Sequence, residues 1–412
     1  MRTMLSPKHI LMAVSALDMF AAGLLMPQLA SHVKSLGGSH IVIGVMGALY
    51  SASQLISGPL IGSLSDLRGR KPILLLCLGI CGLSYLSLGF ITSVYIFLVV
   101  RVILGLTKQT QLLSKALGPD YVKGAEQSVL YGRMASISGI GMSIGPILGG
   151  HIMDAFPEKG FTVITIMMAG IFALNKVLIQ SLPEIEEKKT ENKKETPIAP
   201  KLIDSIKSPL TESIQEFYKI DWTVFGDVFL FKLLMTLSMM MYFGNFGLFL
   251  RTVHSVSPKN LGYIISFQGL TGSLCTYFIG HINKLYKNDT DFSQRNFHIF
   301  LIITLTLTGL ALAPTLSIFI VLLMPLAIVS SIGRIVTLEM ITSKSKSENR
   351  GTVIGASNSV KSLSGVFTPL IAGVINQYLG TVFVFLMAAS FTGIGSVVSY
   401  RIRLKSLEAK DK

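Results

Sequence analysis

The chain has 412 residues, half of them hydrophobic, and a mean hydropathy of +0.61. Only 14% of its residues are charged, so the core of an ordinary soluble domain could not hide this much apolar surface. The formal net charge of +14 would indicate a nucleic-acid partner in a soluble protein, but basic residues at membrane edges explain it better. The composition therefore excludes a soluble fold and indicates a polytopic membrane protein without a nucleic-acid partner.

Apolar runs long enough to cross about 30 Å of hydrocarbon, roughly 20 residues each, recur along almost the whole chain. We predict an all-α membrane protein with twelve transmembrane helices. The predicted spans lie near residues 9–30, 41–63, 72–92, 94–114, 128–153, 161–182, 222–250, 260–283, 297–313, 315–342, 350–376 and 380–401. The first run lacks a basic leader followed by a small-residue cleavage site, so we expect a retained span.

Residues 183–221 interrupt the apolar pattern with seven Lys and nine Asp or Glu, and we predict a solvated cytoplasmic linker there. A regulatory or partner-binding role for this linker is an open alternative. Residues 1–182 then form an N-terminal six-helix half, and residues 222–412 form a C-terminal six-helix half with a short cytoplasmic tail.

The two halves repeat one another. Three residues of the fifth span recur 223 positions later in the eleventh span: Gly132, Pro146 and Gly150 correspond to Gly355, Pro369 and Gly373. Parallel repeats of this kind are a transporter architecture, in which the substrate lies between halves that rock against each other. The repeat predicts two pseudo-symmetric halves.

The distribution of basic residues predicts the orientation. With both termini in the cytoplasm, twenty-five of the 36 Lys and Arg fall on the cytoplasmic side and four fall outside. Basic residues concentrate on the cytoplasmic side of membrane proteins. We therefore expect both termini to be cytoplasmic, in either the plasma membrane or an intracellular membrane.

The turn between the second and third spans has an acid, a glycine turn and a basic cluster. Such a turn can hold a charge relay that locks neighbouring helices in one state, or it can simply stop a helix with positive-inside charges. The pattern resembles the signature loop of the major facilitator superfamily, G-x-L-a-D-r-x-G-r-k, with Leu67 where the first base is usual. The matching residues, which we predict to act in gating, are Gly62, Asp66, Arg68, Gly69, Arg70 and Lys71.

The fifth span is similar to a second motif, g-x-x-x-G-P-x-x-G-G, which is associated with the antiporters of that superfamily. Glycines four residues apart form a groove for close helix packing, and a proline kinks the helix. The residues of this predicted packing motif are Gly141, Gly145, Pro146, Gly149 and Gly150. The resemblance covers nearly the whole chain and implies the major facilitator fold and secondary transport. The stretch 101–123 resembles the animal group called major facilitator superfamily domain-containing protein 9, itself similar to tetracycline-efflux-like antiporters.

Charged residues inside spans are costly, at least about 2.5 kcal/mol each at mid-bilayer, so each needs a partner or a watery cavity. Asp18 lies about ten residues into the first span, and a proton site and a structural partner for a base are equally open for it. Arg101, Lys108 and Lys115 are spaced at sevens along the fourth span, so we expect all three to project from one helical face. The resemblance places the first and fourth spans beside a central cavity, with Asp18 within reach of Arg101 or Lys108.

In the second half, Asp227 and Lys361 complete the predicted substrate and proton pathway. Arg334 and Glu339, near the cytoplasmic end of the tenth span, are the predicted gate pair, although simple snorkelling to the interface is an equal alternative.

Seven bases against three acids within the spans favour an anionic substrate. We expect a monomeric, proton-coupled secondary transporter of a small organic solute that works by alternating access. An efflux antiporter for cationic or amphipathic drugs, and a non-transporting receptor or scaffold of transporter descent, are the alternatives. No phosphate-binding loop or metal-binding helix motif occurs, so we expect neither an enzyme nor a cofactor or metal.

Overall fold

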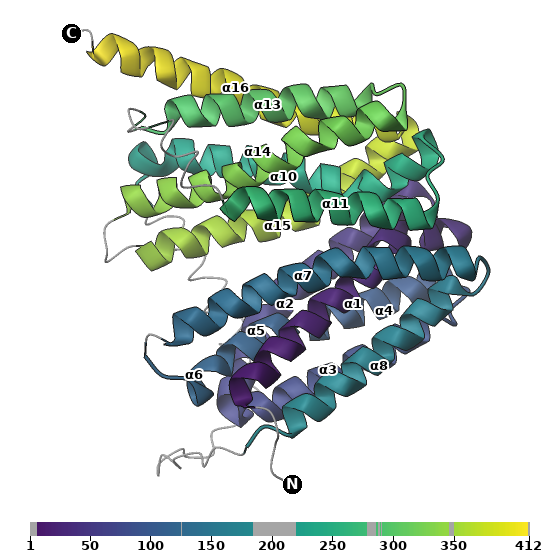
Figure 1. Ribbon diagram of the computed structural model, residues 1–412. Coiled ribbons are helices and arrows are strands. Elements are labelled where there is room, and N and C mark those ends of the chain that lie inside the picture. The colour runs from purple at the N-terminus through teal and green to yellow at the C-terminus, as the bar shows by residue number, and fades with distance from the viewer. Residues whose placement is uncertain are drawn as a thin grey trace. The chain divides into compact units, whose positions relative to one another are not determined.

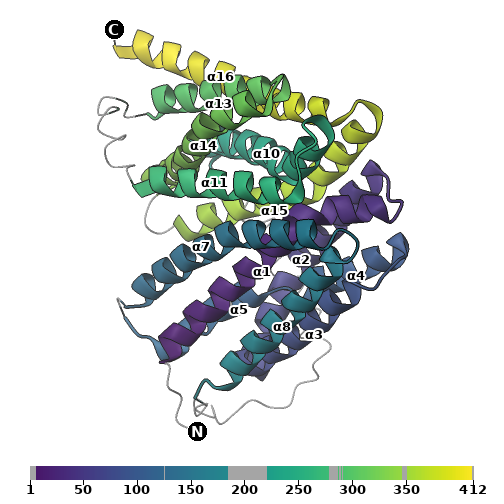
Figure 2. The same cartoon turned by 45° about the vertical axis from the view of Figure 1, so that its right-hand side comes forward.

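The computed structural model describes residues 6–124, 126–183, 220–277, 286, 289, 291–345 and 350–410. Every regular element among them is an α-helix (Figures 1 and 2), which confirms the all-α prediction. The helices are α1 (Pro7–Ser35), α2 (His40–Arg68), α3 (Arg70–Leu88), α4 (Val94–Thr107), α5 (Thr110–Ala116), α6 (Gly118–Tyr121), α7 (Glu126–Ala155), α8 (Gly160–Gln180), α10 (Trp222–Val253), α11 (Pro258–Tyr277), α13 (Ser293–Ala311), α14 (Leu316–Lys344), α15 (Arg350–Tyr378) and α16 (Thr381–Lys410). Of the predicted linker, residues 184–219 lie outside the described residues.

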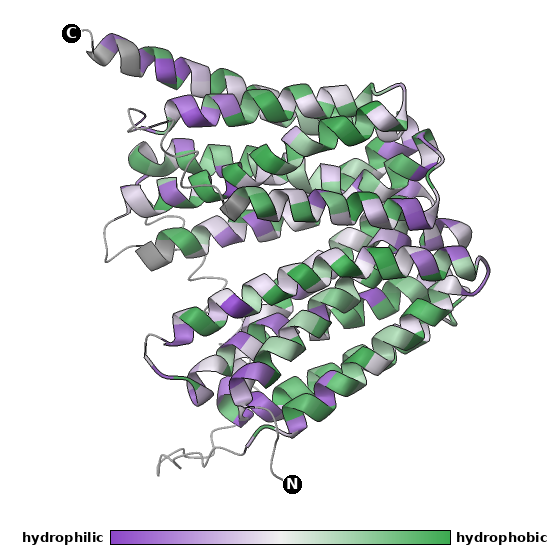
Figure 3. Cartoon of the chain, in the orientation of Figure 1, coloured by the Kyte–Doolittle hydropathy of each residue, from purple (hydrophilic) through white to green (hydrophobic). Residues whose placement is uncertain are grey.

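Length and composition suit these helices to a bilayer. Within the described residues, eight segments are long and apolar enough to cross a membrane by composition alone, and one of them joins α4, α5 and α6 as Val94–Tyr121. Hydrophobic residues run along the helices (Figure 3), and large apolar side chains such as Leu83, Leu305 and Val321 are exposed. Exposed apolar surface of this kind is stable against lipid and unstable in water. The protein is an integral, multi-pass membrane protein.

Local chemistry explains where several helices begin. Pro7 stands in the first turn of α1, where its missing N–H costs no hydrogen bond. The Asp221 side chain caps α10 by accepting from the Thr223 backbone N–H at 3.0 Å. The Thr315 hydroxyl caps α14 by accepting from the Ile318 N–H at 3.4 Å.

The chain divides into two compact units. Unit 1 comprises Met1–Gly38, Leu49–Glu212 and Ser257–Tyr263, and unit 2 comprises Ser39–Ala48, Ser213–Val256 and Ile264–Lys412. Within unit 1, α1 packs along α7, and α3 packs along α8; within unit 2, α16 packs along α13 and α10. The units differ from the predicted halves by two short exchanges, the first turns of α2 and those of α11.

The glycines of the fifth span bring α7 against α1 inside unit 1. A Cβ atom added at Gly141, Gly145 or Gly149 would lie 2.5, 2.6 and 2.6 Å, respectively, from a backbone carbonyl oxygen of α1. Only a residue without a side chain permits such an approach. Gly150 faces a different neighbour, the carbonyl of Pro258 at the start of α11.

Candidate functional site

Asp18 and Lys108 form a buried ion pair in unit 1. The Lys108 Nζ atom lies 2.5 Å from Asp18 Oδ1, and the exposed fractions of the two side chains are 8% and 0%. The second carboxylate oxygen, Oδ2, accepts a hydrogen bond from Gln111 Nε2 at 3.0 Å, and the same amide also donates to the Ser15 carbonyl. Both oxygens of a fully buried acid are therefore bound, one of them by a base. Removing either partner of such a pair leaves an uncompensated buried charge.

The fourth span is broken at Lys108. Helix α4 ends at Thr107 and α5 begins at Thr110, and Lys108 itself has φ −76° and ψ 64°, outside the helical region. Side chains of α2 hold the freed carbonyls, because Gln54 donates to the Lys108 oxygen and Ser57 to the Gly105 oxygen, both at 3.2 Å. The expectation of one continuous helical face through Arg101, Lys108 and Lys115 is wrong, since these donors replace the helical hydrogen bonds at the break.

Arg101 is buried but lies against an aromatic ring rather than an acid. Its guanidinium carbon is 4.2 Å from the centre of the Tyr50 ring, in cation–π geometry. Among the described residues, no acid lies within ion-pair distance of Arg101. The structure thus assigns Lys108, and not Arg101, as the partner of Asp18.

Buried hydroxyls flank this ion pair. Ser15 precedes Asp18 by three residues on α1, and Thr110 and Ser114 stand one turn apart on α5, which contacts α1. Within the described part of the chain, none of these three hydroxyls has a hydrogen-bond partner. Buried hydroxyls of this kind bind water in polar interiors.

The signature turn brings one arginine between two acids. Arg70 Nη2 lies 3.2 Å from Asp66 Oδ1, and Nη1 lies 3.1 Å from Asp120 Oδ1 and donates to the Ala116 carbonyl at 2.7 Å. Gly69 has a φ of 93°, a conformation that favours glycine and allows α3 to start directly after α2. The Arg70 contacts tie the end of α2 and the start of α3 to the end of α5 and to α6.

The other residues of the turn take separate positions. Lys71 donates to the Leu182 carbonyl at 2.6 Å, whereas the Arg68 side chain is exposed. Gly62 has open space where a Cβ atom would lie, and its carbonyl accepts from Ser65 at 2.6 Å. Arg70 is therefore the residue of the turn that joins several elements.

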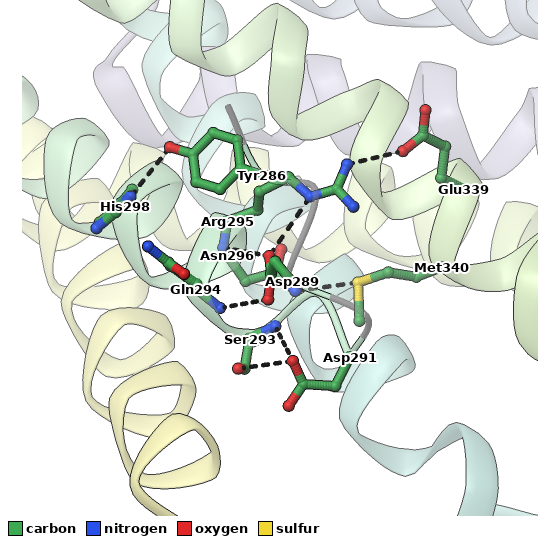
Figure 4. Close-up of polar contacts among 10 residues, drawn as sticks. All are labelled: Tyr286, Asp289, Asp291, Ser293, Gln294, Arg295, Asn296, His298, Glu339 and Met340. Atoms are coloured by element: carbon green, nitrogen blue, oxygen red, sulfur yellow. Dashed lines mark hydrogen bonds and ion pairs between the residues drawn. The ribbon is translucent and has the colours of Figure 1, made fainter. Parts of the chain in front are cut away.

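Unit 2 holds a similar cluster that sequence reasoning missed (Figure 4). Arg295, near the start of α13, lies between Asp289 Oδ2, at 3.4 Å from Nε, and Glu339 Oε2 on α14, at 3.3 Å from Nη1. The backbone N–H groups of Gln294 and Arg295 also donate to Asp289. The signal was present, because the 223-residue repeat carries Asp66 to Asp289.

Aromatic rings surround the Arg295 cluster. The Arg295 guanidinium carbon lies 4.6 Å from the ring centre of Phe292 and 5.9 Å from that of Tyr286. The Tyr286 ring is drawn beside Arg295 in Figure 4. Burial, and secondarily the charge of Asp289, raises the pKa of the Tyr286 phenol. The Tyr286 hydroxyl stays a neutral partner for the His298 ring, 3.0 Å away.

Arg334 and Glu339 do not form the predicted gate pair. Glu339 binds Arg295, and Arg334 donates to the Ser331 hydroxyl at 2.9 Å. Residues five apart on a helix are turned by about 140° around the axis, so their side chains diverge. Only the tertiary structure shows which base forms an ion pair with Glu339.

Asp227 and Lys361 occupy different levels of unit 2. Asp227, in the second turn of α10, binds the Lys344 ammonium at 2.8 Å, where α10 begins and α14 ends. Lys361 lies in the middle of α15 with an exposed side chain. The structure does not bring these two residues together.

We expect Arg295→Gln to destabilise the protein more than Arg70→Gln. Each change frees two acids, but the Arg295 side chain is 11% exposed and that of Arg70 is 32% exposed, and buried charged hydrogen bonds contribute more. Arg295→Gln should cost about 1.5–3 kcal/mol. Thermal unfolding of the purified variants checks the order, with Lys123→Gln, a change at an exposed loop base, as the control. An equal loss of stability in all three variants would contradict the predicted order.

Comparison with known proteins agrees with this architecture. The chain matches the family described as Major Facilitator Superfamily over residues 10–290 and 228–412. It is 29% identical to the class D tetracycline resistance protein of Salmonella ordonez over 193 residues, which are 46% of this chain and 49% of that protein. The match thus spans about half the length of this curated relative.

Solved structures share the fold. The chain superposes with a TM-score of 0.77 on an inward-facing, occupied bacterial homolog of the human lysosomal transporter Spinster, at 12% identity, covering 95% of each chain. Against the human organic anion transporter MFSD10 (TETRAN) the TM-score is 0.61 at 20% identity, covering 95% of this chain and 98% of that one. At these low identities the matches show a shared fold. With an all-helical fold, a signature turn around Arg70 and a family match along nearly its whole length, the chain belongs to the major facilitator superfamily.

Proposed function

We propose that this protein is a proton-coupled secondary transporter of a small organic solute, working by alternating access with both termini in the cytoplasm. The observation that carries the proposal is the buried Asp18–Lys108 pair at the break between α4 and α5. Broken helices that expose backbone groups and hold charged side chains are typical ion and substrate sites in transporters. An acid in this position can exchange its basic partner for a proton.

The geometry links the protonation of Asp18 to the restraint on the junction between α4 and α5. When Asp18 is ionised, it holds the Lys108 ammonium, and Lys108 is also the residue at which the helix breaks. A proton on Asp18 Oδ1 removes the attraction, while Gln111 still supports Oδ2. The charge of Asp18 therefore controls the restraint on the α4–α5 junction. The hydroxyls of Ser15, Thr110 and Ser114 offer hydrogen bonds to water that carries the proton.

The charge balance of the spans supports an anionic solute. Lys108 is neutralised by Asp18, but Arg101 and Lys361 have no acid partner among the described residues, and both stay on the proposed pathway with Asp227. An excess of fixed positive charge attracts anions and repels cations. The similarity to the human organic anion transporter agrees with this substrate class.

A second candidate is efflux of amphipathic or cationic drugs. The observation that favours it is the similarity to tetracycline resistance proteins, which is stronger in sequence than the similarity to the anion transporter. A non-transporting receptor or scaffold of transporter descent is the third candidate. Buried ionic groups oppose it, because apolar residues in their place are often more stabilising.

Reconstituted proteoliposomes test the proposed function. With an imposed pH gradient, a panel of organic anions, cations and tetracycline should reveal at least one solute whose flux follows the gradient and moves protons, read by an internal pH-sensitive dye. Liposomes without protein are the control. Solute flux that is independent of the gradient would remove proton coupling, and ligand binding without any flux would favour the receptor.

A further inference from the structure

Three basic side chains of unit 2 lie at one depth on three helices. Lys232 lies ten residues after the start of α10, Lys361 lies eleven after the start of α15, and Arg334 lies ten before the end of α14. At 1.5 Å per residue each is about 15 Å from its helix end, about a third of the way along helices of 29 to 32 residues. The ion pair between Asp227 and Lys344 joins the start of α10 to the end of α14, so these depths are counted from the same side.

Two of the three charges act on the third, and no acid among the described residues is paired with Lys232 or Lys361. After burial itself, the groups that act on Lys232 are the charges of Lys361 and Arg334. The acids of the same helices, Asp227 and Glu339, are held in ion pairs by other bases. Within the described residues, neither the Lys232 nor the Lys361 ammonium has an ion-pair or hydrogen-bond partner. Helices α10, α14 and α15 contact one another, so three uncompensated charges belong to one region of unit 2.

The exposure of these groups indicates a space that solutes can enter. The side chains of Arg334 and Lys361 are exposed, and that of Lys232 is half-buried. An exposed ammonium or guanidinium that faces lipid inside the hydrocarbon layer is costly. The three charges therefore face water rather than lipid.

We propose that Lys232, Arg334 and Lys361 bind the anionic group of the transported solute, a carboxylate or a comparable oxyanion on a small organic molecule. Arg334 gives one N–H to Ser331 and keeps other donors free for a planar carboxylate. The two ammonium groups add charge, and a bound anion relieves the repulsion among all three bases. The inference rests on the proposed transport function and names its substrate class.

The basic groups of unit 1 are less suited to this role. Lys108 is neutralised by Asp18, and Arg101 is 3% exposed and lies against the Tyr50 ring. The proposed proton site thus lies in unit 1, and the proposed anion site lies in unit 2.

Ligand-induced thermal stabilisation of the purified full chain in neutral detergent tests the site. Succinate and salicylate should raise the unfolding temperature saturably, and tetraethylammonium should not. Lys232→Gln, Arg334→Gln and Lys361→Gln should each weaken apparent anion affinity about tenfold, the effect of losing one charged hydrogen bond. Lys405→Gln, which removes one charge at the exposed end of α16, should keep wild-type affinity. Lys361→Glu should lose anion binding.

A second measurement uses the unaltered chain. Bound succinate should slow the acetylation of Lys232 and Lys361 by acetic anhydride, read by peptide mass spectrometry, without slowing that of Lys405. The absence of protection would overturn the proposal even if a variant failed to fold. Stabilisation only by tetraethylammonium, or only by added phosphatidylglycerol, would also overturn it.

The test separates this proposal from proton coupling. Asp18→Asn lies in the other unit and should still bind succinate, so a failure of proton-driven flux with intact anion binding affects the transport proposal alone. Proton-driven flux of a cation, with no anion binding, overturns the anion site alone.

Discussion

Asp18→Asn is expected to reduce solute flux driven by a pH gradient to that of empty proteoliposomes. Asparagine keeps the shape of the side chain but cannot exchange a proton, so Lys108 loses the partner whose charge changes. The single variant should also lose stability, about 3–5 kcal/mol, because it leaves a buried ammonium without a counter-ion. Flux is measured with an internal pH dye, and stability by thermal unfolding in detergent.

The double variant Asp18→Asn with Lys108→Gln separates coupling from folding. Removing both charges leaves a neutral hydrogen-bonding pair, which should recover much of the lost stability. Proton-driven flux should remain absent, since no titratable acid is left at the break. Wild-type coupling in this double variant would show that Asp18 does not carry the proton.

Gly145→Ala is expected to disrupt the packing of α7 on α1. The added Cβ atom would lie 2.6 Å from the Phe20 carbonyl oxygen and 2.7 Å from Gly23 Cα, both backbone atoms that no side-chain rotation can move. Overpacking of this kind costs roughly 1–3 kcal/mol or more. The unfolding temperature of the purified protein should fall accordingly.

Gly139→Ala provides the matched control on the same helix. No heavy atom lies within 4 Å of the Cβ position at Gly139, and alanine is a better helix former than glycine by up to about 1 kcal/mol. Its unfolding temperature should therefore stay unchanged or rise. A similar loss in both variants would contradict the contact with α1 as the cause of the loss in Gly145→Ala.

The fold followed from the sequence because its signals are local. Apolar runs of membrane length and the signature turn each depend on short stretches of chain, and the structure is all-helical with eight candidate spans among its described residues. The break at Lys108 has no such signal, since neither proline nor glycine stands at residues 107–109. Hydrogen bonds from Gln54 and Ser57, more than forty residues away in sequence, sustain it. A helix break that depends on hydrogen bonds from another helix cannot be predicted from a local sequence pattern.

The pairing of charges likewise needed the tertiary structure. The sequence placed Asp18 near either Arg101 or Lys108, and the structure brings it to Lys108 while Arg101 lies on Tyr50. Helical periodicity relates residues on one helix, but the rotation and depth of one helix against another depend on packing. The ion pair between Arg295 and Glu339 likewise could not be predicted from helical periodicity.

By itself, the sequence determined that the chain spans a membrane repeatedly, that its halves are related, and that basic charge outweighs acid within its spans. Tertiary structure alone decided which charges neutralise one another and which remain free. The reason is physical: transfer into lipid depends on each segment's own composition, whereas an ion pair depends on a few ångströms between helices distant in sequence. That difference leaves Lys108 neutralised by Asp18, and Lys232, Arg334 and Lys361 without acid partners among the residues that the structure describes.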